Sequence, residues 1–480
     1  MPGTETEHGQ ATRGYRLAHD SLGDIQVPEE AYWGAQTQRA IANFPISGLR
    51  FPRRFLRAQG IVKRSAARAN AEVGMLKRPL ADAIAEAARE VMEGKLDDQF
   101  PLDVYQAGAG TSQNMNANEV IANRACELLG RPRGDTKTVH PNDMVNMAQS
   151  TNDTMHVVIQ VAMAEAMAYD LLPALGQLES VLEEKARAFD PILKSGRTHL
   201  QDAVPIRLGQ EFRGYLGSVR IAHRALEQSL EHLYEIGMGG TAVGTGINAD
   251  PGFGALAVGF IAEETGLAFR LPESMFAFMQ NLDAVVEASG SVRTLAVALT
   301  KLANDVRLLS SGPRTGIAEI RLPAVQPGSS IMPGKVNPVM AEMLNMVCYQ
   351  VFGHDATVAA AAQGAQLELN VMMPVMGYNA VMEVTILARA VDAFVSRALR
   401  GLEADEERCR NSIERSTAIV TALNPILGYD RAAQIAKRAF AEGRTVREIL
   451  VDEAILPKEE IDRALDVRAM TEPGARGGEG

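Results

Sequence analysis

Apolar and small residues recur at alternating spacings of four and three along a segment in the second half of the chain. Between residues 277 and 309 these positions form one seam: Val285, Ser289, Val292, Ala296, Leu299, Ala303 and Val306. Such spacing is typical of a long bundle helix with one buried face. The segment contains no proline, so the pattern predicts a single helix over 277–309.

The same periodicity recurs in four further segments, separated by breaks rich in glycine or proline: 155–188, 206–236, 340–363 and 376–402. Five such helices predict an all-α fold with a long central bundle. Helices this long expose more apolar surface than one bundle covers, so we expect an oligomer. The expected domains are a mostly helical N-terminal domain (1–150), the bundle (151–405) and a small C-terminal domain (406–480) with a disordered tail from residue 472.

Four short polar stretches interrupt the helical pattern. They are AGTSQNMN (109–116), HPNDMVNMAQSTND (140–153), GRTHLQD (196–202) and GSSIMPGKVNP (328–338). Each combines hydroxyl, amide or backbone N–H donors with small residues, and the last adds a lysine between glycine and proline breaks. Many hydrogen-bond donors with only a modest positive charge suit a small dicarboxylate.

Composition narrows the classes of partner. A net charge of −11 gives no electrostatic reason to bind nucleic acid or an anionic membrane. The apolar runs are broken well short of a membrane span, and the first twenty residues lack an apolar signal core, so we expect no membrane segment and a cytoplasmic protein. Three cysteines, Cys126, Cys348 and Cys409, cannot form a closed disulfide framework.

The motifs do not indicate a site for a metal ion or for a nucleotide. His140 and Asp143 lack further ligands at helical or turn spacing, so we expect no metal site. The glycine-rich run GMGGTAVGTG at 237–246 follows a predicted helix rather than a strand, and PGKVN lacks the Ser or Thr that follows a P-loop lysine. We therefore expect neither a nucleotide nor any other cofactor.

Together, GSSIMPGKVNP, QSTND, GRTHLQDAVP and GGTAVGTG resemble the fumarase/aspartase superfamily, and the resemblance extends in order from about residue 19 to residue 474. The resemblance implies a homotetramer whose long helices form a shared bundle, with each active site assembled from three subunits. It also implies an enzyme that adds or removes HX across a C–C bond beside a carboxylate, usually releasing fumarate. Removing that proton creates a dianionic aci-carboxylate, which requires a base and a local positive potential.

The resemblance assigns Ser329 as the base, and Ser330, Lys335 and Asn337 as anchors of the carboxylate at the reacting end, together with Thr198. Because a serine hydroxyl is a very weak base, its alkoxide needs stabilising N–H groups and Lys335 nearby. The far carboxylate would be bound by Thr111, Ser150 and Thr151. Asn152 and His199 would face the leaving group, with Glu342 orienting the imidazole.

The segment around HPND resembles a loop that binds a second carboxylate outside the catalytic pocket in some members, which would involve Lys137, His140, Asn142 and Asp143. A structural interpretation, an Asx-rich helix start, explains these residues equally well.

The identity of the leaving group depends on weaker signals. AGTSQNMNANEVIANRACELLG, the threonine of QSTND, LLSSGPR and INADPGF are similar to aspartases, whereas YWGAQTQR, HPND and GYDRAA are similar to fumarases or are shared. These similarities favour an aspartate ammonia-lyase that releases ammonia and fumarate. The alternatives are a class II fumarate hydratase, a relative that eliminates a larger amine, and a catalytically inactive structural homologue.

Overall fold

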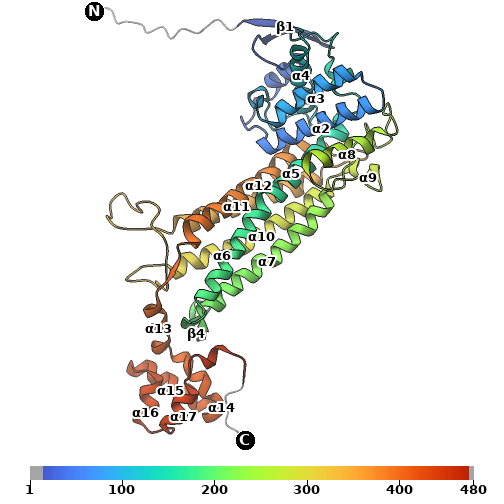
Figure 1. Ribbon diagram of the computed structural model, residues 1–480. Helices are drawn as coiled ribbons and strands as arrows, with labels where there is room; N and C mark the ends of the chain where they lie inside the picture. Colours follow the sequence, from blue (N-terminus) through green and yellow to red (C-terminus); the bar gives the residue numbers. More distant parts are fainter. Residues whose placement is uncertain (1–13, 475–480) are drawn as a thin grey trace, which may run out of the picture. The chain divides into compact units, whose positions relative to one another are not determined.

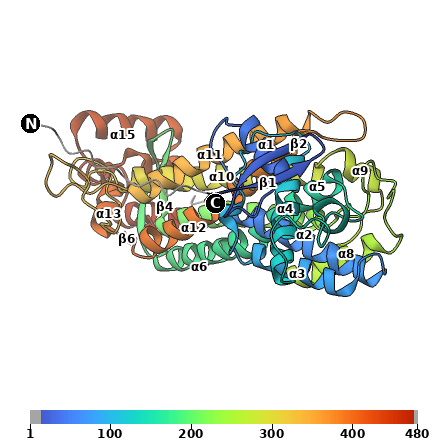
Figure 2. The ribbon, with the colours of Figure 1, turned by 90° about the horizontal axis from the view of Figure 1, so that it is seen from above.

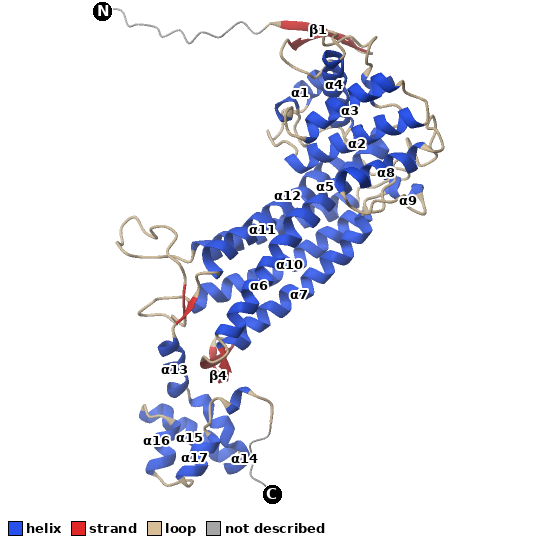
Figure 3. Cartoon of the chain, viewed as in Figure 1, coloured by secondary structure: helices blue, strands red, loops and turns tan. Residues whose placement is uncertain are grey.

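The computed structural model describes residues 14–474 of the chain. Helices dominate this part of the chain, and the strands form three small two-stranded antiparallel sheets (Figures 1 and 3). The residues divide into two compact units. Unit 1 comprises the chain up to Leu172 together with Arg224–Thr294 and Tyr349–Ala388, and unit 2 comprises Pro173–His223, Leu295–Cys348 and the chain from Arg389 onward.

Unit 1 begins with a hairpin and continues with helices. Strands β1 (Tyr15–Asp20) and β2 (Gly23–Pro28) pair antiparallel, with Tyr15 opposite Pro28, and β2 packs on α1 (Figure 2). The helices that lie wholly within unit 1 are α1 (Ala35–Asn43), α2 (Arg53–Glu72), α3 (Arg78–Met92), α4 (Thr111–Leu128), α5 (Thr151–Ala166), α8 (Phe253–Thr265) and α9 (Met275–Gln280).

Unit 2 contains two further hairpins and a helical C-terminal part. Strand β3 (Leu193–Thr198) pairs with β4 (Gln201–Arg207), and β5 (Ile320–Arg321) pairs with β6 (Glu403–Ala404). The C-terminal helices are α13 (Glu406–Arg415), α14 (Asn424–Leu427), α15 (Tyr429–Glu442), α16 (Val446–Asp452) and α17 (Lys458–Ala464). They enclose an apolar cluster that includes Ile413, Leu423, Ile449 and Leu450.

The predicted bundle helices are confirmed. They are α7 (Leu208–Leu233), α10 (Asp283–Leu309), α11 (Val339–Ala362), α12 (Met373–Phe394), and α5 continued through a π-helical turn (Met167–Leu171) into α6 (Leu172–Ala188). All seven seam residues predicted on the segment 277–309 are fully buried. Polar contacts also join neighbouring helices: Tyr215 of α7 donates to Asp305 of α10 at 2.9 Å in unit 2.

The structure departs from the sequence prediction at one end of the longest seam. The predicted helix over 277–309 is two helices, α9 and α10, because the chain is extended at Asn281. The Asn281 side chain donates to Asp283 at 3.0 Å, so that a local side-chain contact marks the start of α10.

One helical stretch, Thr151–Ala188, is long and apolar enough to cross a bilayer by length and composition, but 72% of its most apolar window is buried inside the protein. Core helices of globular proteins share this property. Residues 475–480 of the predicted disordered tail lie outside the described residues, whereas Glu472 forms an ion pair with Arg207.

Candidate functional site

The loop at 328–338 closes on itself through its backbone. The N–H of Gly328 donates to the carbonyl of Lys335 at 2.8 Å, and the Asn337 side chain donates to the carbonyl of Gly328 at 2.7 Å. A Cβ atom at Gly328 would lie 2.4 Å from the Lys335 carbonyl oxygen, so this closure requires glycine. The predicted carboxylate anchors Lys335 and Asn337 therefore belong to one hydrogen-bonded loop.

The hydroxyl of Ser329 accepts two backbone hydrogen bonds within this loop. The N–H groups of Ile331 and Met332 lie 3.2 and 2.9 Å from its Oγ. Two N–H dipoles aimed at one oxygen stabilise negative charge on it, and this is what a serine base needs. Ser330 and Lys335 are exposed in the same loop.

Thr198 and His199 lie at the tip of the β3–β4 hairpin. Thr198 pairs with Gln201, and the two turn residues between them, His199 and Leu200, have φ values of 55° and 59°. Side chains other than glycine are strained in this left-handed region, and such strain concentrates at functional positions. Glu342 lies in the first turn of α11, and within the described residues of one chain no hydrogen bond joins it to His199.

Thr111 is the first residue of α4, where backbone N–H groups have no partner within the helix. The preceding Gly110 has φ 82°, and a Cβ atom there would lie 2.5 Å from the Met155 side chain of α5. Glycine therefore allows α4 to begin against α5 and leaves Thr111 exposed at the helix N-terminus, where the helix dipole favours an anion.

Ser150, Thr151 and Asn152 form the N-terminus of α5, held by a capping box. The Ser150 hydroxyl accepts from the N–H of Asn152, and Asp153 accepts from the N–H of Ser150 at 2.8 Å. The Thr151 hydroxyl receives a hydrogen bond from Asn114 of α4 at 3.1 Å. The side-chain amide of Asn152 donates to the carbonyl of Ala242, in the glycine-rich run.

Behind this helix end lie a buried aspartate and a buried lysine whose environment the sequence analysis missed. The second carboxylate oxygen of Asp153 accepts from the N–H groups of Gly239 and Thr241. The Lys63 ammonium of α2 donates to the side-chain oxygens of Asn146 and Gln149, both at 3.0 Å. Burial lowers the pKa of Lys63 to about 7 and raises the pKa of Asp153 to about 7, and the charge of each opposes the shift of the other. Little in the sequence indicated this burial, because Lys63 lies in a helix that also carries five arginines.

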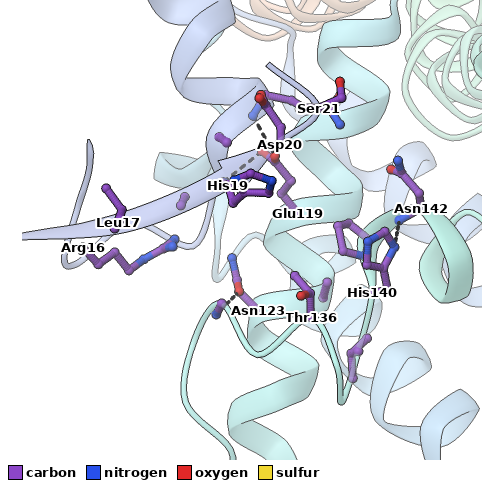
Figure 4. A pocket seen from close by; sticks show the side chains of 18 residues that line it. Arg16, Leu17, His19, Asp20, Ser21, Glu119, Asn123, Thr136, His140 and Asn142 are labelled. Atoms are coloured by element: carbon purple, nitrogen blue, oxygen red, sulfur yellow. Dashed lines mark hydrogen bonds between the residues drawn. The ribbon is translucent and has the colours of Figure 1, made fainter. Parts of the chain in front are cut away.

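A cavity of ≈ 420 Å³ lies beside the HPND segment, between the β1 strand and α4 (Figure 4). His140 and Asn142 line it together with Arg16 and Thr136, whereas Lys137 and Asp143 are exposed and do not. His140 Nδ1 accepts from the N–H groups of Asn142 and Asp143 at 3.2 and 3.1 Å. The neutral imidazole therefore carries its proton on Nε2.

Glu119 lines the same cavity, but its carboxylate is already satisfied. It accepts from the N–H groups of Gly34, Gln36 and Thr37 at the start of α1. Arg16 donates to a backbone carbonyl, that of Ala31, at 3.1 Å. The cavity therefore combines hydrogen-bond donors with two carboxylates that already have partners, Glu119 and Asp20, the latter paired with Arg39. Within residues 14–474, no three His, Cys, Asp or Glu side chains gather as a metal site would require.

The predicted site residues fall into two groups. Unit 1 carries the N-termini of α4 and α5, with Thr111 and Ser150–Asn152, together with the HPND segment. Unit 2 carries Ser329, Ser330, Lys335 and Asn337 in one loop, Thr198 and His199 in a hairpin, and Glu342 on α11. The structure thus brings together the members of each motif.

Comparison with known proteins shows which families the chain resembles. The lyase family matches residues 23–353, and the fumarase C C-terminus matches residues 419–472. A class II fumarate hydratase of Halobacterium salinarum is 52% identical over 97% of this chain and 99% of its own. An aspartate ammonia-lyase of Bacillus subtilis is 46% identical over 97% and 98%. The crystal structure of a class II fumarase from Schistosoma mansoni matches with a TM-score of 0.92 and 38% identity, over 95% of this chain and 99% of that one.

These relatives correct the expected leaving group. Several further class II fumarate hydratases are 46–48% identical to the chain. The prediction that ammonia leaves is therefore wrong, and the similarities favour water. Short stretches such as LLSSGPR and INADPGF were misleading, because an aspartate ammonia-lyase and the fumarate hydratases all share 46–52% of their residues with the chain, and a few short stretches separate such relatives poorly.

Proposed function

Because the chain belongs to the fumarase/aspartase superfamily, we propose that it is a lyase that interconverts fumarate and L-malate by reversible addition of water. The observation that carries the proposal is the 52% identity to a class II fumarate hydratase along 97% of the chain. The geometry of the Ser329 loop supports the chemistry that such an enzyme needs.

When L-malate loses water, Ser329 would take the proton from the carbon beside the reacting carboxylate. The N–H groups of Ile331 and Met332 already point at its Oγ, so they would stabilise the alkoxide that acts as the base. The charge then moves onto the adjacent carboxylate. Lys335, Asn337, Ser330 and Thr198 would bind that carboxylate more strongly as it becomes a dianion, which lowers the barrier.

The opposite carboxylate would rest at the N-termini of α4 and α5. Thr111, Ser150 and Thr151 lie at or beside the first residue of these helices, where N–H groups and helix dipoles attract an anion. No charged residue is needed there, because several neutral donors hold one carboxylate without binding the product too tightly. His199 and Asn152 would then act on the departing water, with Glu342 orienting His199.

The placement of these residues supports an assembly with shared sites. Thr198, His199, Ser330 and Lys335 are exposed in the single chain, although a dehydration site must exclude bulk water. Unit 2 also exposes apolar side chains of α10 and α11, among them Val297 and Met346. A homotetramer that covers these helices would complete the sites with segments from other subunits.

The cavity beside His140 supports a second carboxylate site. The imidazole Nε2–H, the Asn142 side chain and Arg16 supply donors there, and the Glu119 carboxylate already accepts from backbone N–H groups. Titration calorimetry with a non-reacting dicarboxylate would then find two binding events per chain. His140→Ala should remove the weaker event and leave kcat unchanged, whereas a single event in the wild type would disprove this site.

The function is tested by an ultraviolet assay for fumarate. Purified protein should form fumarate from L-malate and consume fumarate in the reverse direction, and it should form none from L-aspartate. Fumarate produced from L-aspartate alone would overturn the proposal. No turnover of L-malate, fumarate or L-aspartate would instead indicate the inactive homologue or a relative that acts on a larger amine.

A further inference from the structure

A buried carboxylate in unit 2 lies between two cations. Glu319 is 1% exposed. Arg197 contacts it through both ends of its guanidinium group, at 3.0 and 2.8 Å, and the Lys194 ammonium lies 3.0 Å from its Oε2. The Lys194 side chain is fully buried and also contacts Glu211 of α7 at 2.8 Å. The two positive and the two negative charges of this cluster therefore cancel.

The members of this cluster belong to two segments with proposed catalytic residues. Lys194 and Arg197 lie on β3, and Arg197 directly precedes Thr198 and His199. Glu319 directly precedes β5, at the start of the segment that leads to Ser329. The ion pairs therefore fasten the hairpin with Thr198 and His199 to the beginning of the segment that carries the base.

The backbone of Glu319 is fixed as well. Its N–H donates to the carbonyl of Leu309 at the end of α10, and its carbonyl accepts from the N–H of Asp405 at 2.9 Å. The Cys409 thiol of α13 lies 3.7 Å from the same carbonyl. Glu319 is thus held by α10 and the C-terminal part through its backbone, and it holds the hairpin through its side chain.

Stability alone does not account for this cluster. The free energy lost when charged groups leave water is about as large as the free energy gained from their attraction. Apolar residues of similar volume therefore often stabilise a fold equally well. A two-pronged arginine–carboxylate contact does, however, fix the distance and orientation of the groups that it joins. Errors of about 1 Å in the position of catalytic groups reduce rates by about a hundredfold.

We propose that Glu319 is a positioning residue that holds both the Thr198–His199 hairpin and the Ser329 segment in their catalytic places through Arg197 and Lys194. This inference rests on the proposed hydratase function. In a tetramer with shared sites, one Glu319 would steady the hairpin of one active site and the base loop of a neighbouring site.

The test compares Glu319→Gln with Glu403→Gln, which makes the same chemical change at an exposed position on β6. Wild-type turnover of fumarate is measured first, and its absence would overturn the proposed function and this inference together. In Glu319→Gln, kcat per folded enzyme should fall about tenfold or more. Size-exclusion chromatography supplies the folded fraction, and Glu403→Gln should retain wild-type kcat.

The pH profile separates positioning from a loss of folded protein. Without the Glu319 charge, Arg197 and Lys194 raise the positive potential at the hairpin, which lowers the pKa of nearby catalytic groups. The limbs of the profile of kcat/KM against pH should therefore move to lower pH in Glu319→Gln. A purely structural role would scale the profile down without moving it, and that result, or an unchanged kcat, would overturn the inference.

Arg197→Lys provides an independent test, because it keeps the charge and removes the two-pronged contact. We expect kcat to fall about three- to tenfold, with the limbs of the pH profile unmoved. If Glu319→Gln does not fold, Arg197→Lys decides alone: a lower kcat per folded enzyme supports the positioning role, and wild-type kcat overturns it.

Discussion

At the scale of single residues, the Ser329→Ala substitution should separate catalysis from binding most clearly. Replacing Ser329 with alanine removes the proposed proton acceptor, which acts only on the way to the transition state. We expect kcat for L-malate to fall by at least about a thousandfold while a dicarboxylate inhibitor still binds. Stopped-flow assays and calorimetry measure the two quantities.

Neighbouring substitutions serve as controls for this prediction. Lys335→Ala should weaken inhibitor binding as well as kcat, because its charge is felt before and during proton transfer. If Ser329→Ala kept a tenth of wild-type turnover and Ser330→Ala lost it, the second serine would be the base. If both variants stayed active, the loop would only close the site.

Glu383 is a second residue with a distinct behaviour. Its side chain lies buried on α12 near the Ser289 hydroxyl, but that hydroxyl donates to Asp355 at 3.0 Å, and among the described residues neither Glu383 oxygen has a partner in good hydrogen-bonding geometry. Burial, with a smaller contribution from the neighbouring Asp355 carboxylate, raises the pKa of Glu383 well above its usual range. The folded protein therefore keeps the Glu383 proton at pH values where the unfolded chain has released it.

This difference predicts a stability that falls as pH rises. Above the ordinary glutamate pKa of about 4.3, unfolding releases the proton, so wild-type stability decreases by up to about 1.4 kcal/mol per pH unit until the folded pKa is reached. Glu383→Gln lacks this proton. The Tm advantage of Glu383→Gln over wild type, measured by calorimetry, should therefore grow as the pH rises above 5, whereas Glu403→Gln should show no such advantage. A Tm difference that is independent of pH would contradict the assignment.

At the scale of elements, the N-terminus of α5 joins stability to substrate binding. One oxygen of Asp153 caps the helix at Ser150, and the other accepts from the glycine-rich run at Gly239 and Thr241. An asparagine cannot accept at both places, because one of its two terminal groups is a donor. The side chain must therefore release either the helix cap or the glycine-rich run.

Asp153→Asn should destabilise the protein by about 1–3 kcal/mol and raise the KM for L-malate, since Ser150, Thr151 and Asn152 lose their fixed places. Denaturant unfolding and steady-state kinetics measure the two effects. The matched control is Glu448→Gln in the capping box of α16, in the C-terminal part. It should cost some stability and leave KM unchanged. An unaltered KM in Asp153→Asn would show that the α5 cap does not contribute to substrate binding.

At the scale of the whole molecule, the exposed apolar side chains of α10 and α11 predict a tetramer. Val297 is 57% exposed on α10. Val297→Glu should dissociate the assembly in light scattering and remove activity with it, because a charge resists burial in an apolar interface. Val451→Glu, at a half-exposed valine on α16, should change neither. A wild-type monomer with full activity would disprove the shared sites.

Some features of the fold could be predicted without a structure because they depend only on residues close together in the sequence. The seam from Val285 to Val306 predicted burial correctly because helical periodicity depends only on spacing. The GSSIMPGKVNP loop was identifiable because glycine and proline restrict the backbone wherever they occur. The break at Asn281 and the three strand pairings were not expected, since helical periodicity registers neither a local side-chain contact nor backbone pairing, and only the β5–β6 pairing joins segments distant along the chain.

By itself, the sequence determined the all-α bundle, the superfamily and the loop that carries Ser329, because these follow from periodicity, backbone restrictions and contiguous motifs. Only the tertiary structure revealed the N–H groups aimed at the Ser329 hydroxyl, the burial of Lys63 beside Asp153, and the clamp of Lys194 and Arg197 on Glu319. Each of these depends on burial and on distances between residues remote along the chain. Charges in the interior acquire their pKa values and their roles from what surrounds them, and those surroundings exist only once the chain has folded.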